Sequence, residues 1–156
     1  MGDDWASKTA QRLRDNEERQ RQNEDAEMRR EARLRSHAPL LWESLKESIY
    51  QKAIELNKAA YGQKLLTVSP LIEHRQNLEV EGQTAHLRLE FNEAVPMLTH
   101  RVTKQANTPY GSGGRSEGTF LLVVDHDQVW FINKGESGTY KSVEQTAEIL
   151  LNSLLV

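Results

Sequence analysis

Two closely spaced apolar runs lie between Thr119 and Asn133, where the sequence reads TFLLVVDHDQVWFIN. Two short strands joined by a tight turn at His126 and Asp127 explain this pattern, because successive side chains of a strand point to opposite faces. One face of the predicted hairpin then carries Phe120, Leu122, Val124, Val129 and Phe131. The other face carries Leu121, Val123, Trp130 and Ile132. A hairpin with water on one side shows one apolar face, so the second apolar face predicts a further covering element.

Two segments with the apolar spacing of a helix flank the strand-forming region. The segment from Pro39 to Tyr61 is predicted to be a helix that packs against a core and ends at Gly62. Its apolar stripe consists of Leu41, Leu45, Ile49, Ala53, Leu56 and Ala60, flanked by Trp42 and Ile54. Ser142 and Gln145 form a capping box that predicts the start of a C-terminal helix. The broad apolar stripe of this second helix consists of Val143, Ala147, Leu150, Leu151, Leu154 and Leu155.

Between these helices the apolar period changes toward two residues, which is typical of strands. The clearest alternation is Thr84–Phe91, where Ala85, Leu87, Leu89 and Phe91 share one face. Shorter strands are predicted at residues 65–68, 78–80 and 95–103, and the polar, glycine-rich segment 104–118 is predicted to be a long loop. The order of elements indicates an α+β fold, in which an antiparallel meander of about five strands lies between an amphipathic helix and a C-terminal helix.

Residues 1–35 differ from the rest because they contain nine basic and nine acidic side chains. No apolar residue occurs from Arg14 to Asp25, so this part cannot contribute to a core. Its good helix formers predict a projecting charged helix, or a partly disordered extension, ahead of a single α+β domain over residues 36–156. Pro39 predicts a fresh helix start or a kink at the boundary. Apolar residues are too few here for a strong coiled coil.

Composition narrows the functional classes. The chain has 156 residues and a formal net charge of −3, which does not favour nucleic acid as a partner. It has no cysteine, so disulfide bonds and thiolate metal sites are excluded. No apolar run approaches the roughly 20 residues that span a bilayer, and the acidic N-terminus lacks the apolar core of a secretory signal. A cytoplasmic protein without a cofactor or a membrane partner is the resulting expectation.

The densest ionisable cluster is Asp125-His126-Asp127. An aspartate can orient an imidazole as a general base, and the two groups together can bind a divalent metal. Adjacent strand residues point to opposite faces, however, so a plain hairpin turn is the favoured interpretation. The sequence contains no nucleophile-elbow or HExxH pattern. We therefore identify no catalytic residue and no metal site, and an enzyme is not favoured.

A second candidate surface is the outward face of the predicted sheet. His86, Arg88 and Glu90 share one strand face, which is either the solvated side of the sheet or a polar grip for a ligand. In a common sheet, the apolar side chains of Leu121, Val123, Trp130 and Ile132 would lie on that same face. An apolar surface with a few polar groups is typical of a ligand site or a subunit interface.

Three functional hypotheses follow from these surfaces. The leading one is a non-enzymatic protein-interaction or self-association module, with a homo-oligomer or another protein as the partner. The second is a small-molecule binding or catalytic domain that uses the outward face. The third is an accessory nucleic-acid binder through the Arg-rich N-terminal helix and the Tyr110–Arg115 loop. The outward face accordingly has three candidate covers: a second subunit, the N-terminal helix or a ligand.

Overall fold

The structure is a computed structural model that describes residues 2–70, 76–105, 113–135 and 139–155. It divides into two units, Met1–Arg33 and Leu34–Val156, and each is described by itself. In chain order the elements are helix α1 (Gly2–Ala59), strands β1 (Thr67–Pro70), β2 (Asn77–Glu81), β3 (Ala85–Asn92), β4 (Met97–Lys104), β5 (Arg115–Asp125), β6 (Gln128–Asn133) and β7 (Tyr140–Lys141), and helix α2 (Val143–Leu155). The α+β class predicted from the sequence is confirmed.

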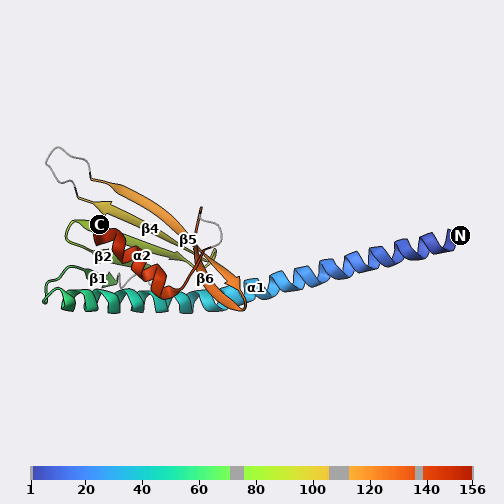
Figure 1. Cartoon of the computed structure of the whole chain (residues 1–156), viewed down its shortest axis with the longest axis horizontal. Helices are drawn as coiled ribbons and strands as arrows, with labels where there is room; N and C mark the ends of the chain where they lie inside the picture. Colours follow the sequence, from blue (N-terminus) through green and yellow to red (C-terminus); the bar gives the residue numbers. More distant parts are fainter. Residues whose placement is uncertain (1, 71–75, 106–112, 136–138, 156) are drawn as a thin grey trace. The chain divides into compact units, whose positions relative to one another are not determined.

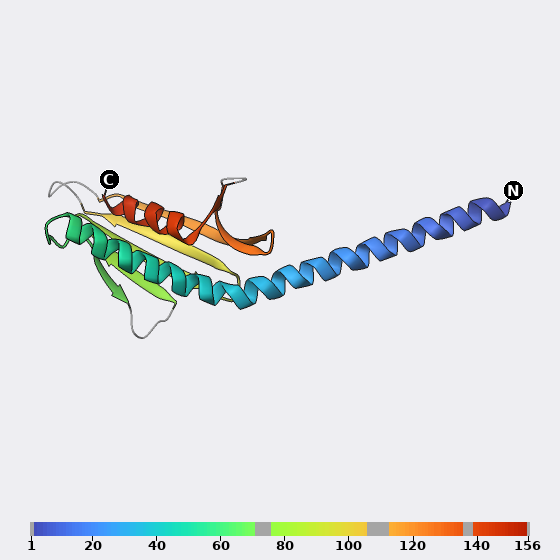
Figure 2. The same ribbon diagram turned by 60° about the horizontal axis from the view of Figure 1, so that its bottom comes forward.

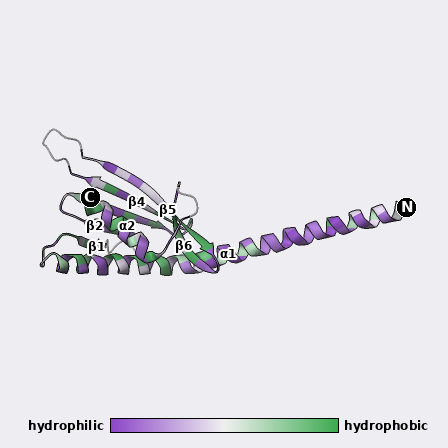
Figure 3. Ribbon diagram, in the orientation of Figure 1, coloured by the Kyte–Doolittle hydropathy of each residue, from purple (hydrophilic) through white to green (hydrophobic). Residues whose placement is uncertain are grey.

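The first unit is helical over its described residues, so the helical prediction for this charged segment is confirmed. Its few large apolar side chains are exposed: Trp5 by 72%, Leu13 by 60% and Met28 by 68%. Local polar contacts follow the helical spacing, such as the ion pair of Lys8 Nζ with Asp4 Oδ2 at 3.1 Å. Figure 3 shows the hydrophilic colour over most of this segment. Its helicity therefore depends on backbone propensity and local polar pairs rather than on burial.

The seven strands form one antiparallel sheet in sequence order, β1 to β7 (Figure 1). The hairpin register is confirmed, because Val124 pairs with Val129 and Leu121 pairs with Ile132. His126 and Asp127 have φ angles of 48° and 63°, the left-handed values that a type I′ turn requires.

The structure differs from the predicted strands in two details. The sheet has seven strands rather than about five, since β7 is a two-residue strand with too short a pattern to detect. Strand β5 begins at Arg115, inside the segment 104–118 that was predicted to be a loop. Residues 115–118 pair with residues 100–103 of β4, and this cross-strand pairing overrides their polar composition. Residues 106–112 lie outside the described part of the chain.

One face of the sheet is covered by the second-unit part of α1 and by α2, as Figure 2 shows. From the sheet this core takes Leu78, Val80, Ala85, Leu87, Leu89, Phe91, Leu98, Val102, Phe120, Leu122 and Phe131. Trp42 of α1 stacks on Phe91 of β3 with ring centroids 5.4 Å apart, and Phe120 meets Phe131 edge to face at 6.3 Å. The hairpin face that contains Phe120 thus lies on the sheet face that the helices cover. We call this sheet face the inner face.

Of the two outcomes predicted at Pro39, the fresh helix start was wrong, because α1 continues through this residue. A proline inside a helix removes one backbone hydrogen bond and costs about 3 kcal/mol. Ala38 and Trp42, on either side of it, are 1% and 2% exposed, so core packing holds this turn in place. The buried stripe of α1 also begins one turn earlier than predicted, with Ala38, and Leu41 is only partly buried.

Both predicted helix ends are confirmed. Helix α1 ends at Ala59, and Tyr61 just beyond it has a left-handed φ of 59°, which places the Gly62 N–H to donate to Asn57 O at 3.0 Å. At the start of α2, Ser142 N donates to Gln145 Oε1 at 3.0 Å and Gln145 N donates to Ser142 Oγ at 3.2 Å. These reciprocal bonds are the capping box expected from the sequence.

Candidate functional site

The sheet face opposite the helices, which we call the outer face, contains all seven candidate site residues. The strand register divides this face into two zones. The polar zone lies over β2 to β5 and consists of Glu79, Glu81, His86, Arg88, Glu90, Arg101, Arg115 and Glu117. The apolar strip lies over β4 to β7 and consists of Met97, Leu121, Val123, Trp130, Ile132 and Tyr140.

The charged side chains of the polar zone pair with one another. Glu117 Oε1 accepts hydrogen bonds from Arg101 Nε at 2.8 Å and from an Arg115 guanidinium nitrogen at 2.7 Å. The bond from Arg115, together with the charge of Arg101, lowers the pKa of Glu117. Arg88 Nε lies 3.2 Å from Glu90 Oε1. Such exposed pairs are screened by water and contribute little to stability. They also partly neutralise the charge that these cations could offer to an anionic ligand.

His86 lies between two carboxylates of β2. Its Nε2 is 3.8 Å from Glu79 Oε2 and its Nδ1 is 3.9 Å from Glu81 Oε1. Both distances exceed the range of a direct hydrogen bond, so these carboxylates do not hold the imidazole in one tautomer. This arrangement is typical of a solvated sheet face rather than of an oriented catalytic base.

The apolar strip forms two adjacent rows across the strands. Met97, Leu121, Ile132 and Tyr140 occupy one row, on β4, β5, β6 and β7. Val123 and Trp130 occupy the next row. The Trp130 and Tyr140 rings lie 6.5 Å apart in a tilted arrangement, and Tyr140 is 45% exposed. The other strip residues are partly exposed, so together they offer a continuous apolar surface.

The structure does not bring Trp130 and His86 together. His86 belongs to the ladder row of Arg115, whereas Trp130 belongs to the row of Val123, eight residues further along β5. At about 3.3 Å per residue, the two rows are separated by about 26 Å along the strand. Trp130 also lies three strands away from His86. One small ligand therefore cannot contact both residues.

Sequence reasoning missed Met97 and Tyr140 as members of the apolar strip. Met97 follows Pro96 at the start of a strand with weak alternation, and only the pairing of β4 with β5 places it beside Leu121. Tyr140 belongs to the two-residue strand β7, which has no periodicity to detect. The ion pair of Arg101 with Glu117 also depends on a cross-strand register that spans 16 residues of sequence.

The turn at residues 125–127 does not hold its imidazole in hydrogen-bond contact with Asp125. His126 is 95% exposed, and its Nε2 lies 3.9 Å from Asp125 Oδ2. Within residues 2–70, 76–105, 113–135 and 139–155, no cluster of three or more His, Asp or Glu side chains is placed to hold a metal ion. Of the glycine-rich segment Tyr110–Arg115, Arg115 belongs to β5 and residues 110–112 lie outside the described part of the chain.

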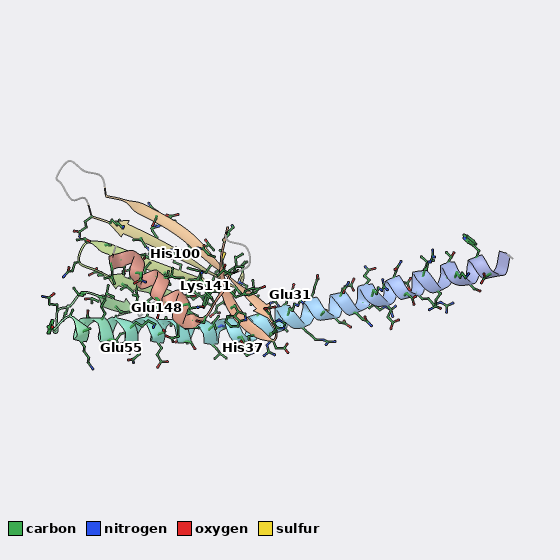
Figure 4. All side chains as sticks on the ribbon, in the orientation of Figure 1. Glu31, His37, Glu55, His100, Lys141 and Glu148 are labelled. Carbon is green, nitrogen blue, oxygen red and sulfur yellow. The ribbon has the colours of Figure 1, made fainter. Side chains whose placement is uncertain are left out.

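A second cluster of charged side chains connects the two helices. Lys52 Nζ of α1 lies 3.1 Å from Glu144 Oε2 and 3.2 Å from Glu148 Oε1 of α2 (Figure 4 labels Glu148). The bonds to the two carboxylates raise the pKa of Lys52 and lower that of Glu144. A pocket of about 480 Å³ opens beside this cluster, lined by Ser44, Glu47, Ser48, Gln51, Lys52, Glu55, Val143 and Glu144. The Lys52 ammonium group is ion-paired with both carboxylates. These ion pairs connect the two helices.

No helix among the described residues is both long enough and apolar enough to cross a membrane. Comparison with known proteins found no match to a family model, to a curated protein or to a solved structure.

Proposed function

We propose that the protein is a self-association module whose outer sheet face binds a second copy through the apolar strip. The observation that supports this proposal is the continuity of the strip across four neighbouring strands, with Trp130 and Tyr140 adjacent at one end. Tryptophan and tyrosine side chains are typical anchors of protein interfaces. A polar border is equally typical, and the paired charges of the polar zone supply one.

The same geometry argues against a small ligand at this face. The polar groups named as ligand contacts lie far along the sheet from Trp130, and Arg88 is paired with Glu90. A ligand at the apolar strip would therefore find few polar groups to orient it, whereas specific small-molecule sites need some. A protein partner, by contrast, can bind a flat apolar surface without a concave pocket or converging polar groups.

Measuring the mass of the full chain by light scattering over a range of concentrations tests the proposal. The unmodified chain is expected to associate as its concentration rises, and Trp130→Glu is expected to abolish this step while the fold is retained. Thr103→Glu is the matched control, because it places the same carboxylate on the outer face but within the polar zone. Tyr140→Glu provides a second variant at a more exposed position of the strip.

Two results would overturn the proposal. One is an unmodified chain that remains monomeric at all concentrations. The other is association that continues unchanged in Trp130→Glu and Tyr140→Glu while circular dichroism shows both variants to be folded.

A further inference from the structure

The charged helix of the first unit contains a heptad pattern whose core positions are uncharged and mostly polar. When Ala6 is assigned to position a, the core positions a and d up to residue 23 are Ala6, Thr9, Leu13, Asn16, Gln20 and Asn23. None of these six is charged, although ten of the twenty residues from 6 to 25 are charged. The pattern ends at Glu27 and Arg30, which place charges at the next two core positions. We call residues 6–24 the polar seam.

The charged residues on either side of the core positions of the polar seam are sorted by heptad position. Arg12 and Arg19 occupy position g, and Glu17 and Glu24 occupy position e. In a parallel two-stranded coiled coil, each g residue faces the e residue of the following heptad on the partner helix. Arg12 would therefore face Glu17 of a second copy, and Arg19 would face Glu24 of that copy, which gives four attractive pairs in a homodimer.

The antiparallel arrangement lacks this complementarity. There, g faces g and e faces e, so arginine would meet arginine and glutamate would meet glutamate. Like charges at these positions oppose pairing and opposite charges favour it. The charge pattern thus selects both the occupant, a second copy of this chain, and its direction.

The structure leaves this face of the helix open within its unit. Residues 2–33 are helical, Leu13 is 60% exposed, and the Glu17 and Glu24 side chains are exposed. Gln20 Nε2 at position a lies 3.3 Å from Glu24 Oε1 at position e, so the seam amides can reach the flanking charges. We propose that the polar seam pairs with the same segment of a second copy as a parallel, in-register two-stranded coiled coil.

The chemistry of the seam predicts the character of this pairing. Leu13 is the only large apolar residue among its core positions, so little apolar area is buried and the dimer is weak. Asparagine and glutamine in a coiled-coil core lower stability but restrict register and the number of strands. The flanking ion pairs are exposed, so association should weaken as salt is raised. This surface is distinct from the apolar strip of the sheet, and the two proposals can fail separately.

Cysteine cross-linking of the full chain tests register and direction, because the natural chain contains no cysteine. Leu13→Cys at position a is expected to give a disulfide-linked dimer with oxidised glutathione, since the two sulfurs face each other across a parallel seam. Glu18→Cys at position f is the control, because this position points away from the partner. The proposal is overturned if both variants cross-link to the same extent, or if neither variant cross-links.

Charge exchange provides a second test that leaves the core positions untouched. Both Glu17→Arg/Glu24→Arg and Arg12→Glu/Arg19→Glu are expected to weaken self-association by about tenfold, because all four g–e pairs become repulsive. An equimolar mixture of these variants, or one chain that contains all four substitutions, is expected to restore it. Failure of both to restore association would overturn the proposed pairing.

These tests also separate the coiled coil from the sheet interface. Cross-linking through Leu13→Cys is expected to persist in a chain that also contains Trp130→Glu. Loss of cross-linking in that chain would show that the helices meet only because the sheets do, and would overturn an independent helix contact.

Discussion

The imidazole of His100 lies directly against the backbone of Gly118 on the inner face of the sheet. The two residues are cross-strand partners on β4 and β5, and a Cβ atom at position 118 would come within 2.5 Å of His100 Nε2. The ring also contacts Phe120, with centroids 5.3 Å apart, and Nε2 is buried without a hydrogen-bond partner among the described residues. Gly118 therefore provides the space that the histidine ring occupies (Figure 4 labels His100).

Gly118→Ala is expected to destabilise the second unit by about 1–3 kcal/mol, the usual cost of overpacking a filled site. The added methyl group would force the His100 ring away from Phe120, since backbone of a central strand has little freedom to move. Denaturant unfolding measures this change. Gly114→Ala is the matched control, because a Cβ at Gly114 meets nothing within 4 Å. Equal stability of the two variants would contradict the packing described here.

Stability should fall as the pH is lowered through the titration of His100. Burial lowers the pKa of this imidazole, whereas in the unfolded chain it has the ordinary value of about 6.5. The unfolded state therefore binds a proton first, so the stabilising contribution is present above about pH 6.5 and is lost as the pH falls through the folded-state value. The free energy of unfolding, measured from pH 8 to pH 5, is expected to decline more steeply in the unmodified chain than in His100→Leu. Parallel profiles would contradict this assignment.

The hairpin and the helix caps could be predicted because their signals are local. Alternating apolar residues determine which face each side chain takes, and Ser142 with Gln145 identifies a helix start by itself. The predicted two-residue turn placed Trp130 opposite Val123, and the structure shows this pairing. Each of these features depends on residues that are close in sequence.

The features that could not be predicted depend on residues that are distant in sequence. The helix continues through Pro39 because Trp42 reaches Phe91 of β3, whereas a proline alone predicts a fresh helix start or a kink. Arg115 belongs to a strand because β4 lies beside it. The pairing of Arg101 with Glu117 likewise follows from that register, so the separation of the outer face into two zones became visible only in the folded sheet.

Asn57 holds the chain that leaves helix α1, and its truncation is expected to be costly. Its Oδ1 accepts from the N–H groups of Leu65 at 2.9 Å and Leu66 at 3.1 Å, and its Nδ2 donates to Leu66 O at 2.9 Å. Asn57→Ala would remove the side-chain partner of the Leu66 N–H and C=O groups and leave the Leu65 N–H with its second acceptor, Gln63 O at 3.0 Å, so the expected loss is about 1–3 kcal/mol. Thermal or denaturant unfolding measures the loss. Asn152→Ala, at an exposed position of α2, is the control and should be nearly neutral.

Replacing the hairpin turn with Asn-Gly is expected to stabilise the second unit. His126 and Asp127 both have positive φ, where an ordinary side chain is strained, whereas Asn and Gly adopt this conformation readily. The double substitution His126→Asn/Asp127→Gly should raise the free energy of unfolding by about 0.5–1 kcal/mol, since relief of strain exceeds the entropy that glycine adds to the unfolded chain. His126 is almost fully exposed, so no packing is lost. Gly135→Ala is the opposite control, because its φ of 101° excludes a Cβ and the substitution should destabilise. A destabilised Asn-Gly variant would show that the His126 or Asp127 side chain contributes to this turn more than its exposure indicates.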